Sequence, residues 1–374
     1  MHKQKSDRNI ATLHDVARVV GVSPGTVSRA LSRPDLVAPK TRDLILKVVE
    51  QLHYVPDAAG RSLRSSTPNL IGAIIPKMGV STFSQTTAGL NDTLDEHNMT
   101  LIVSQPELTS TSSKSAVHRL IQRGADGLVL LGEDHDPDLF EMLEHRGLPY
   151  VLLWTVCAPP GKNYVSVDQI KAGHLAADHL LKLGHKNFAY LGSPLSTNPR
   201  AAARLNGVQE RLRSAGIALP LTAIIEESHQ FGSGRLAVDR ILGHHPETTA
   251  IICTSDYHAL GVLRGLYEIN CKVPEDISVV SFNNNDFSAF TMPSITTVDL
   301  KQRDVGIEAA KMILRLLRGE RVKPVMIEPI LAARESSGQV KKSLSVAKKT
   351  LKPSAPRGSA ATNKSESSLR KQKK

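Results

Sequence analysis

Residues that could contact a nucleic acid crowd the stretch GVSPGTVSRAL, residues 21–31. The guanidinium of Arg29 has paired N–H donors in the geometry that matches O6 and N7 of guanine. Its neighbours are small or carry hydroxyl groups, which permits a close approach: Ser23, Pro24, Gly25, Thr26 and Ser28. If this stretch forms an exposed helix in a DNA groove, we expect Arg29 to contact a base.

Two short helices must position these side chains. Thr12, followed three residues later by Asp15, forms a capping-box pattern at the start of the first helix. Together with Ser23, Pro24, Gly25, Thr26 and Ser28, we also expect Thr12 to contact DNA. Gly21 favours the left-handed conformation that ends it, and Ser23 followed by Pro24 is a good start for the next helix. This spacing predicts a helix-turn-helix, whose second helix can enter the major groove of DNA.

A third helix is predicted over residues 40–52, where an apolar stripe would pack under the first two helices. The stripe consists of Leu44, Ile45, Val48, Val49 and Leu52. Helix-turn-helix patterns on short windows also occur in helical hairpins that bind no DNA. On these residues alone, a hairpin with a solvated Arg29 stays open as an alternative.

The segment DAAGRSLRSS, residues 57–66, has the composition of neither a flexible linker nor a stable helix. Gly60 costs about 1 kcal/mol of helix stability relative to alanine, and one or two helical turns are marginal in water. A segment that folds only on DNA explains this mixture. We expect Arg61 and Arg64 to contact phosphates and Leu63 to insert between base steps in the minor groove.

From residue 70 onward, apolar runs alternate with amphipathic helical segments. The runs are continuous, which is typical of strands buried on both faces of a parallel sheet. They lie at 70–76, 100–105, 127–132, 149–154, 187–192, 250–255 and 278–283. Strand–helix repetition predicts a doubly wound α/β architecture, and the number of runs favours two such sheets.

Charge divides the 374 residues into three parts. Residues 1–66 hold 11 Lys and Arg against 6 Asp and Glu, residues 67–339 hold 25 against 29, and residues 340–374 hold 11 against 1. Basic ends on a mildly acidic body indicate a polyanionic partner for the ends alone. The last part has few large apolar residues, so we expect a disordered tail, either a solvated extension or a source of nonspecific DNA affinity.

Several other classes of protein are disfavoured. The three cysteines, Cys157, Cys253 and Cys271, are far apart and form no C-x-x-C pair, which indicates a reducing compartment. No apolar run reaches the roughly 18–20 residues of a membrane span, and the N-terminus lacks the apolar core of a signal peptide. We therefore expect a cytoplasmic protein without membrane association.

The head and hinge resemble the lactose-repressor/galactose-repressor (LacI/GalR) family of transcriptional regulators. The similarity runs from TLHDVARVVGVSPGTVSRALSRPDLVAPK through HLLKLGHKNFAYLG to VPEDISVVSF, and covers about residues 10–336. It implies an all-α helix-turn-helix head and an α/β two-lobed body of the periplasmic-binding-protein type I fold. The implied divisions are a head at 10–55, a hinge helix and linker at 56–68, a body at 69–338 and a basic tail at 339–374.

The resemblance also implies an effector held between the two lobes. Arg204 in ARLNG matches the family's effector-binding arginine, and Asp256 in TSDYHAL matches its usual hydroxyl-binding aspartate. Trp154 ends a strand, where doubly wound folds bind ligands, with simple packing as the alternative. The remaining expected site residues are Phe83, Arg200 and Asn283.

The sequence departs from the family's pattern at positions that, in similar proteins, contact the DNA bases or the effector. Pro24 and Gly25 stand where family members place the residues that most often read bases. Asn283 replaces a usual effector-binding aspartate, and KMGVSTFSQ replaces a run of the Asn-Pro-Phe-Phe type. Two arginines spaced four residues apart, at 200 and 204, and the loss of one carboxylate favour an anionic effector such as a sugar acid. A pocket for a neutral sugar is the alternative.

Two motifs could suggest enzymatic or metal chemistry. GSGRLA, residues 232–237, matches a dinucleotide fingerprint, but a polar run separates it from any strand, so a helix start is favoured. EDHDPD, residues 133–138, clusters carboxylates around a histidine, yet acidic residues between a strand and a helix more often cap the helix. We expect no metal, no cofactor and no catalytic activity.

The sequence therefore predicts a cytoplasmic, nucleoid-associated transcriptional regulator, in the first instance a repressor. A homodimer or tetramer would bind a near-palindromic double-stranded operator, because two-fold symmetry matches two half-sites. A small-molecule effector would control that binding. The alternative is a small-molecule receptor whose head binds DNA only nonspecifically, which Pro24 and Gly25 keep open.

Overall fold

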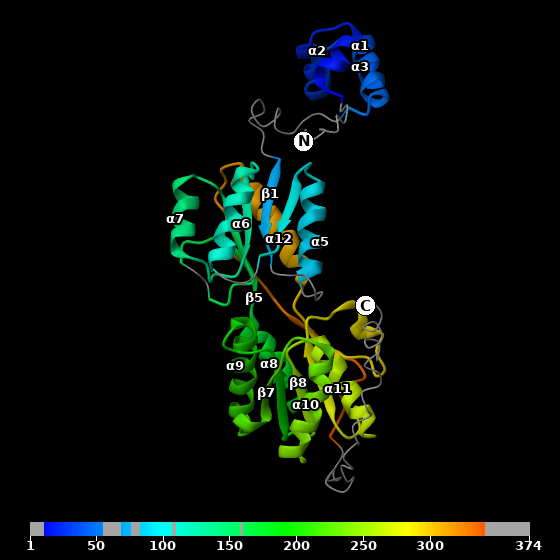
Figure 1. Cartoon of the computed structure of the whole chain (residues 1–374). Helices are drawn as coiled ribbons and strands as arrows, with labels where there is room; N and C mark the ends of the chain where they lie inside the picture. The colour runs from blue at the N-terminus through cyan, green and yellow to red at the C-terminus, as the bar shows by residue number, and fades with distance from the viewer. Residues whose placement is uncertain (1–10, 55–68, 76–82, 107–109, 158–159, 341–374) are drawn as a thin grey trace, which may run out of the picture.

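The computed structural model describes residues 11–54, 69–75, 83–106, 110–157 and 160–340 (Figure 1). A three-helix head is followed along the chain by two α/β lobes. The head contains α1 (Leu13–Val20), α2 (Pro24–Ser32), the short 3-10 helix η1 (Pro34–Leu36) and α3 (Pro39–Gln51). The hinge expected at 56–68, with Arg61, Leu63 and Arg64, lies outside the described residues, as does the tail from residue 341.

The local signals of the helix-turn-helix are confirmed. The hydroxyl of Thr12 accepts a hydrogen bond from the Asp15 main-chain N–H at 3.3 Å, and the Asp15 carboxylate accepts one from the Thr12 N–H at 3.0 Å. Gly21 adopts a left-handed φ of 76°, and Ser23 Oγ accepts from the Thr26 N–H at 3.1 Å. These caps satisfy donors that a first helical turn leaves free.

A small apolar core joins the three helices and consists of Val16, Ala17, Val27, Ala30, Ile45 and Val48. One expectation for the third helix is wrong, because Leu44 is 49% exposed. Ile45, Val48, Val49 and Leu52 recur at three- and four-residue spacing. Leu44 lies about 100° around the helix from Ile45 and so falls outside the stripe.

Each lobe contains a six-stranded sheet. The strand order is β11-β5-β4-β3-β1-β2 in lobe 1 and β12-β10-β9-β8-β6-β7 in lobe 2. All pairs are parallel except β10 with β12. The strands are β1 (Leu70–Ile74), β2 (Thr100–Ser104), β3 (Gly127–Leu131), β4 (Tyr150–Leu153), β5 (Tyr164–Val167), β6 (Phe188–Gly192), β7 (Ile224–Glu226), β8 (Ala250–Cys253), β9 (Ser278–Phe282), β10 (Thr296–Asp299), β11 (Val325–Ile327) and β12 (Ile330–Ala332).

All seven predicted apolar runs form strands, and the expectation of two sheets is confirmed. Every residue of β3, β6 and β9 is buried. Within β3, Val129 and Leu131 enter one apolar cluster while Leu128 and Leu130 enter another on the opposite face. A strand covered on both faces needs apolar residues at every position, which explains the continuous runs.

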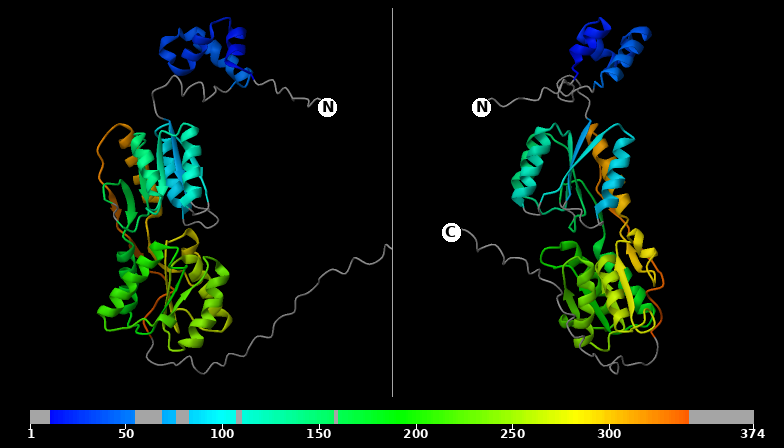
Figure 2. Two further views of the ribbon diagram at one scale, coloured as in Figure 1. Left: turned by 60° about the vertical axis from the view of Figure 1, so that its left-hand side comes forward. Right: turned by 45° about the vertical axis from the view of Figure 1, so that its right-hand side comes forward.

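Helices cover both faces of each sheet (Figure 2). In lobe 1, α5 and α12 pack together on one face, and α6 and α7 on the other; in lobe 2, α8 pairs with α9 and α10 with α11. Their bounds are α5 (Ser84–Asp95), α6 (Ser110–Gln122), α7 (Pro137–His145), α8 (Gln169–Lys182), α9 (Pro199–Ser214), α10 (Phe231–His244), α11 (Asp256–Glu268) and α12 (Gln302–Leu317), with 3-10 turns η3 (Leu221–Ala223) and η4 (Asp286–Ala289).

Glycines let the paired helices approach closely. A Cβ atom at Gly306 of α12 would lie 2.0 Å from the main-chain oxygen of Thr86 in α5. A Cβ atom at Gly234 of α10 would lie 2.2 Å from the main-chain oxygen of His258 in α11. The GSGRLA motif therefore belongs to a helix start, as predicted, and its second glycine serves helix packing.

The chain passes between the lobes three times. It crosses between β5 and α8, between β10 and α12, and between β11 and β12. One apolar cluster continues from the α5–α12 side of lobe 1 to the α8–α9 side of lobe 2. No helix in the described ranges is both long and apolar enough to span a bilayer.

Candidate functional site

The exposed face of α2 carries the residues expected to contact DNA. Val27 and Ala30 are buried beneath it, while Gly25 and Arg29 are exposed. Arg29 Nε donates a hydrogen bond to the main-chain oxygen of Gly25 at 3.1 Å, which holds the guanidinium along this face. A Cβ at Gly25 would meet nothing closer than Ser23 Oγ at 3.7 Å, so the surface beside Arg29 is open.

The other expected DNA contacts have structural roles in the head as well. Thr12 and Ser23 cap α1 and α2, and Pro24 is the first residue of α2. The Thr26 hydroxyl lies 2.9 Å from Ser23 Oγ, and Ser28 is half-buried.

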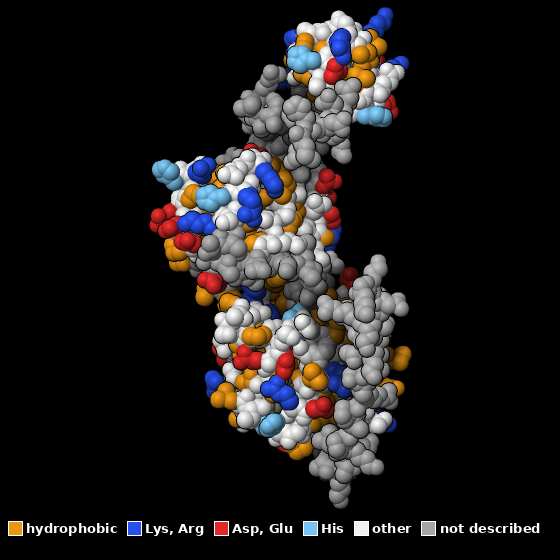
Figure 3. All heavy atoms as spheres, viewed as in Figure 1, with side chains coloured by type: hydrophobic (Ala, Val, Ile, Leu, Met, Phe, Trp, Pro, Cys, Tyr) orange, Lys and Arg blue, Asp and Glu red, His pale blue; other side chains and the backbone are white. Residues whose placement is uncertain are grey.

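On the face of the body shown in Figure 3, basic and acidic side chains are interspersed over both lobes.

One wall of the junction between the lobes is aromatic. Trp154 directly follows β4, has a left-handed φ of 57° and is only 3% exposed. Its ring meets Phe83, which directly precedes α5, edge to face with 6.4 Å between centroids. Trp154 Nε1 has no hydrogen-bond partner among the described residues. Both the packing role and the ligand-contact role therefore stay compatible with this side chain.

Arg200 extends from lobe 2 to lobe 1. It lies in the first turn of α9, and its guanidinium carbon lies 6.0 Å from the centroid of the Phe83 ring. Its Nη1 would be 3.9 Å from a Cβ atom placed on Gly132 of lobe 1. Burial lowers the pKa of Arg200, and the nearby carboxylate of Glu133 opposes that shift.

Arg204 lies one helical turn further along α9 and is 7% exposed. Its guanidinium carbon lies 5.3 Å from the centroid of the Phe282 ring, and Nη1 donates to Oε1 of Gln169. Its Nε has no partner in the described part of the chain. Burial lowers the pKa of Arg204 to about 10, with a further decrease from nearby Arg200.

Asp256 is fully buried at the start of α11. One carboxylate oxygen accepts from the hydroxyls of Ser281 and Thr297, the latter at 2.8 Å; the other accepts from the main chain and side chain of Asn285 at 2.6 and 3.0 Å. Burial raises the pKa of Asp256, and these hydrogen bonds oppose the shift. Both oxygens are thus engaged within lobe 2, where they organise the loop after β9.

Asn283 begins that loop. It has a left-handed φ of 106° and Asn284 one of 55°, conformations that asparagine adopts more readily than most residues. The Asn283 N–H donates to the main-chain oxygen of Val298 at 3.0 Å. Its main-chain oxygen accepts from Nε2 of Gln302 at 3.4 Å.

The structure therefore brings most of the expected effector residues to one place. Phe83 of lobe 1 meets Arg200 of lobe 2 directly, and Trp154 packs on Phe83. Arg204 and Asn283 lie at the same junction, through their hydrogen bonds with Gln169 and Gln302, and Asp256 is buried in lobe 2. Sequence reasoning missed Gln169 and Gln302, which lie at the first and second crossings between lobes. A glutamine in a first helical turn carries no motif, so only the topology identifies them.

The acidic segment 133–138 is a helix start, as the sequence favoured. Asp136 accepts a hydrogen bond from the Asp138 N–H at 3.1 Å and caps α7, and Lys114 pairs with both carboxylates. Within the described ranges, no group of three or more His, Cys, Asp or Glu could hold a metal ion. Within the part of the chain that the structure describes, none of the three cysteines forms a disulfide.

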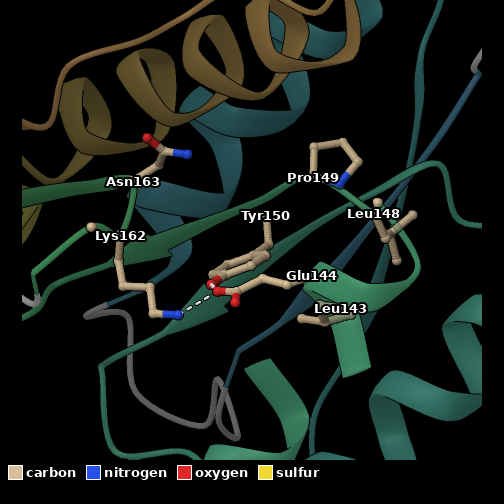
Figure 4. A pocket seen from close by; sticks show the side chains of 9 residues that line it. Leu143, Glu144, Leu148, Pro149, Tyr150, Lys162 and Asn163 are labelled. Atoms are coloured by element: carbon tan, nitrogen blue, oxygen red, sulfur yellow. Dashed lines mark hydrogen bonds and ion pairs between the residues drawn. The ribbon is translucent and has the colours of Figure 1, made fainter. Parts of the chain in front are cut away.

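A separate cavity of about 320 Å³ lies where β4 and β5 begin (Figure 4). Its charged groups neutralise one another. Glu144 pairs with Lys162 at 2.5 Å and accepts a hydrogen bond from the Tyr150 hydroxyl at 2.9 Å. This cavity therefore offers a ligand no uncompensated charge, in contrast to the junction between the lobes.

Comparisons with known proteins match this architecture. Residues 12–57 match the model for bacterial regulatory proteins of the lacI family, and residues 177–337 match a periplasmic binding protein-like domain. The HTH-type transcriptional repressor CytR of Escherichia coli K12 is 30% identical over 321 residues, which is 86% of this chain and 94% of the repressor.

Solved structures give the same result. The lac repressor dimer bound to operator and the anti-inducer ONPF superposes with a TM-score of 0.79 at 27% identity, covering 88% of this chain and 99% of that chain. The complex of the transcriptional regulator CelR with cellobiose has a TM-score of 0.64 at 26% identity, and the match covers 87% of this chain and 100% of that chain. With the helix-turn-helix head, the two-lobed body and this extent of identity, the chain belongs to the LacI family of bacterial regulatory proteins.

Proposed function

We propose that this protein is a repressor whose hold on a near-palindromic operator is controlled by an anionic small molecule bound between the lobes. The single observation that carries the anion is the environment of Arg200 and Arg204. Neither forms an ion pair within the described residues. A buried charge without a partner is strongly destabilising, so a ligand carboxylate or phosphate would supply what the two guanidiniums lack.

The surroundings of the two arginines support this assignment. Arg204 donates to Gln169, an uncharged amide, and stacks on Phe282. Asn283 contributes no negative charge at the same junction. The carboxylate of Glu133 opposes the lowering of the Arg200 pKa. Oε1 of Glu133 accepts hydrogen bonds from the main-chain N–H groups of Val156 and Cys157 at 2.9 and 3.1 Å, within lobe 1.

On the DNA side, a homodimer would present two α2 helices to two half-sites. The lac repressor is a dimer on its operator in a structure similar to this one, which supports the same arrangement here. The protein would then act in the cytoplasm, at the nucleoid. The effector would favour one arrangement of the two lobes and so change the population that binds operator.

The anion is tested by thermal denaturation with neutral sugars, sugar acids, other carboxylates and nucleobases. An acid near saturation should raise the melting temperature by several degrees, since ligand at 100 Kd adds about 2.7 kcal/mol. Arg204→Met and Arg200→Met should lose this stabilisation, whereas the exposed Arg213→Met on the same helix should keep it. Stabilisation by a neutral sugar or a base that Arg204→Met leaves unchanged would overturn the anionic effector.

A second function is favoured by Pro24 and Gly25, whose side chains form no hydrogen bond to a base edge. The protein would then be a receptor with a head that binds DNA only nonspecifically. A gel shift on sequences selected from a random pool, with and without unrelated competitor DNA, separates the two. The complex of a repressor with its selected site persists when competitor DNA is added. A head that binds only nonspecifically loses its complexes with selected and unrelated DNA equally.

A further inference from the structure

Gln302 is a buried amide at the second crossing between the lobes. It is the first residue of α12 and is 4% exposed. Its Nε2 donates to the main-chain oxygen of Asn283 at 3.4 Å, and its own main-chain oxygen accepts from Thr86 Oγ1 at 3.0 Å. Gln302 therefore contacts the loop after β9 in lobe 2 and α5 in lobe 1 at the same time.

The side-chain amide oxygen of Gln302 takes part in neither of these hydrogen bonds. Its Oε1 is buried and has no donor within the ranges that the structure describes. The carbonyl of Asn283 fixes the amide's orientation, because a flipped amide would bring two acceptors together. Buried polar atoms are nearly always paired in folded proteins, so an orphan acceptor at this junction indicates that a ligand supplies the donor.

Gln302 and Arg204 lie against consecutive residues of lobe 2. The Arg204 guanidinium stacks on the Phe282 ring at 5.3 Å, and the Gln302 amide bonds to the main chain of Asn283. Arg204 Nε and Trp154 Nε1 have no acceptor among the described residues. The junction thus offers unpaired donors for an anionic group and one unpaired acceptor for a different group.

We infer that the effector is a hydroxycarboxylate, and that Gln302 Oε1 accepts a hydrogen bond from its hydroxyl. The inference rests on the proposed function and names the ligand class of the same site. An ionised carboxylate has no proton to donate, so it cannot satisfy Gln302, and a second group on the ligand must do so. Because Gln302 also holds Thr86, the hydroxyl would stabilise the contact between the β9 loop and α5.

The test uses acids in matched pairs that differ by one hydroxyl: malate and succinate, lactate and propionate, gluconate and 2-deoxygluconate. Calorimetric Kd values are measured on the full chain for the wild type, Gln302→Leu, Gln302→Glu and Gln85→Leu. Leucine removes the acceptor at similar volume, and glutamate keeps an acceptor oxygen. Gln85 is the control, because its amide also bridges the lobes, to Asp286 at 3.3 Å, but is paired there.

For at least one pair, the wild type should bind the hydroxylated acid about tenfold more tightly than its partner. Gln302→Leu should bring that ratio to about one and leave the Kd of the deoxy acid within about threefold, whereas a purely structural role would weaken both acids equally. Gln302→Glu should bind both acids more weakly and keep the ratio, which tests the inference even if the leucine variant fails to fold. Gln85→Leu should keep the wild-type ratio.

Two results would overturn the inference. If acids bind through Arg204 but the wild type does not distinguish the members of any pair, or Gln302→Leu keeps the wild-type ratio, Gln302 does not read a hydroxyl and the anionic site stands alone. If no acid binds and a neutral sugar does, the proposed anionic effector fails together with the inference.

Discussion

Arg29 and Arg204 place the same guanidinium group in opposite surroundings. Arg29 lies in solvent on α2, where its only described hydrogen bond is to the Gly25 carbonyl in its own helix. Arg204 is buried against Phe282 with an unpaired Nε. Arg29 can exchange its hydrating water for a base edge with little loss of solvation free energy. Arg204 is buried between the lobes, where a charge without a counter-charge is strongly unfavourable. Substitutions at the two sites therefore report on different partners.

Replacing Arg29 with alanine should cost about 1–3 kcal/mol of binding free energy on the best operator and relax base preference at one position per half-site. The reason is that a bidentate contact to guanine is lost while the fold of the head is unchanged. Selection of bound DNA from a random pool, followed by titration, measures both effects. Arg18→Ala on α1, where Arg18 pairs with Asp15, is the control. An equal loss on every sequence would make Arg29 a phosphate contact.

Two lobe 2 histidines predict a loss of stability in mild acid. Burial lowers the pKa of His229 to about 4, with further decreases from His258 and Arg204, and burial also lowers the pKa of His258. The imidazoles of the unfolded chain take up protons near pH 6.5, whereas those of the folded chain stay neutral. The two histidines therefore contribute fully to the free energy of unfolding above pH 6.5, and this contribution is lost as the pH falls toward 4. His229→Gln should reduce the fall in melting temperature across this interval by a few degrees, while the exposed His118→Gln should not; an unchanged profile would contradict the role of His229.

At the scale of elements, close helix pairs hold each lobe together. In α10, Gly234 faces the main chain of α11, whereas a Cβ at Gly243 of the same helix would meet nothing within 4 Å. The same residue type is thus required by packing at one position and only tolerated at the other. The two positions form an internal comparison within one helix.

Gly234→Ala should lower the free energy of unfolding by about 1–3 kcal/mol, because the new methyl group forces α10 and α11 apart. Gly243→Ala should raise it by up to about 1 kcal/mol through helix propensity. Thermal and denaturant unfolding of the two variants, compared with the wild type, measure the difference in sign. Equal effects at both positions would show that α10 and α11 are not in the close contact described here.

At the scale of the whole molecule, charge distinguishes the two ends of the chain from the body between them. Residues 67–339 are mildly acidic, whereas residues 340–374 carry 11 basic residues and 1 acidic residue. Val340 is anchored to lobe 2 by its N–H, which donates to the main-chain oxygen of Leu183 at 3.0 Å. A deletion from residue 341 onward therefore keeps that anchor.

Deleting residues 341–374 should weaken nonspecific DNA binding and flatten its dependence on salt. Each phosphate contact that is lost makes this negative slope of log K against log salt shallower by about 0.9. Titrations of unrelated duplex DNA from low to physiological salt measure this slope. A full-length tail with its Lys and Arg replaced by Ser separates charge from length. Identical slopes for full and truncated proteins would show that the tail does not touch DNA.

The sequence by itself determined the head and the two-sheet architecture. Caps at Thr12 and Ser23, the turn at Gly21 and the continuous apolar runs all act within a few residues of chain, so their outcome could be predicted locally. The third helix was also predicted, except that Leu44 lies off its buried stripe. Arg204 was expected at the effector site from the resemblance to the family, and Arg200 because it lies four residues earlier, one helical turn away.

The tertiary structure decided the rest. Strands β7, β11 and β12 have three residues each, too short for a pattern to separate them from loops. Strands β5 and β10 have four residues, but their sequences YVSV and TTVD contain polar residues and form no continuous apolar run. Their pairing sets the three crossings between lobes, and these crossings bring Gln169 and Gln302 to Arg204 and Asn283. The crossings depend on contacts between residues far apart in the chain, as does the burial of Asp256 among donors of its own lobe. Periodicity and local caps carry no information about such contacts.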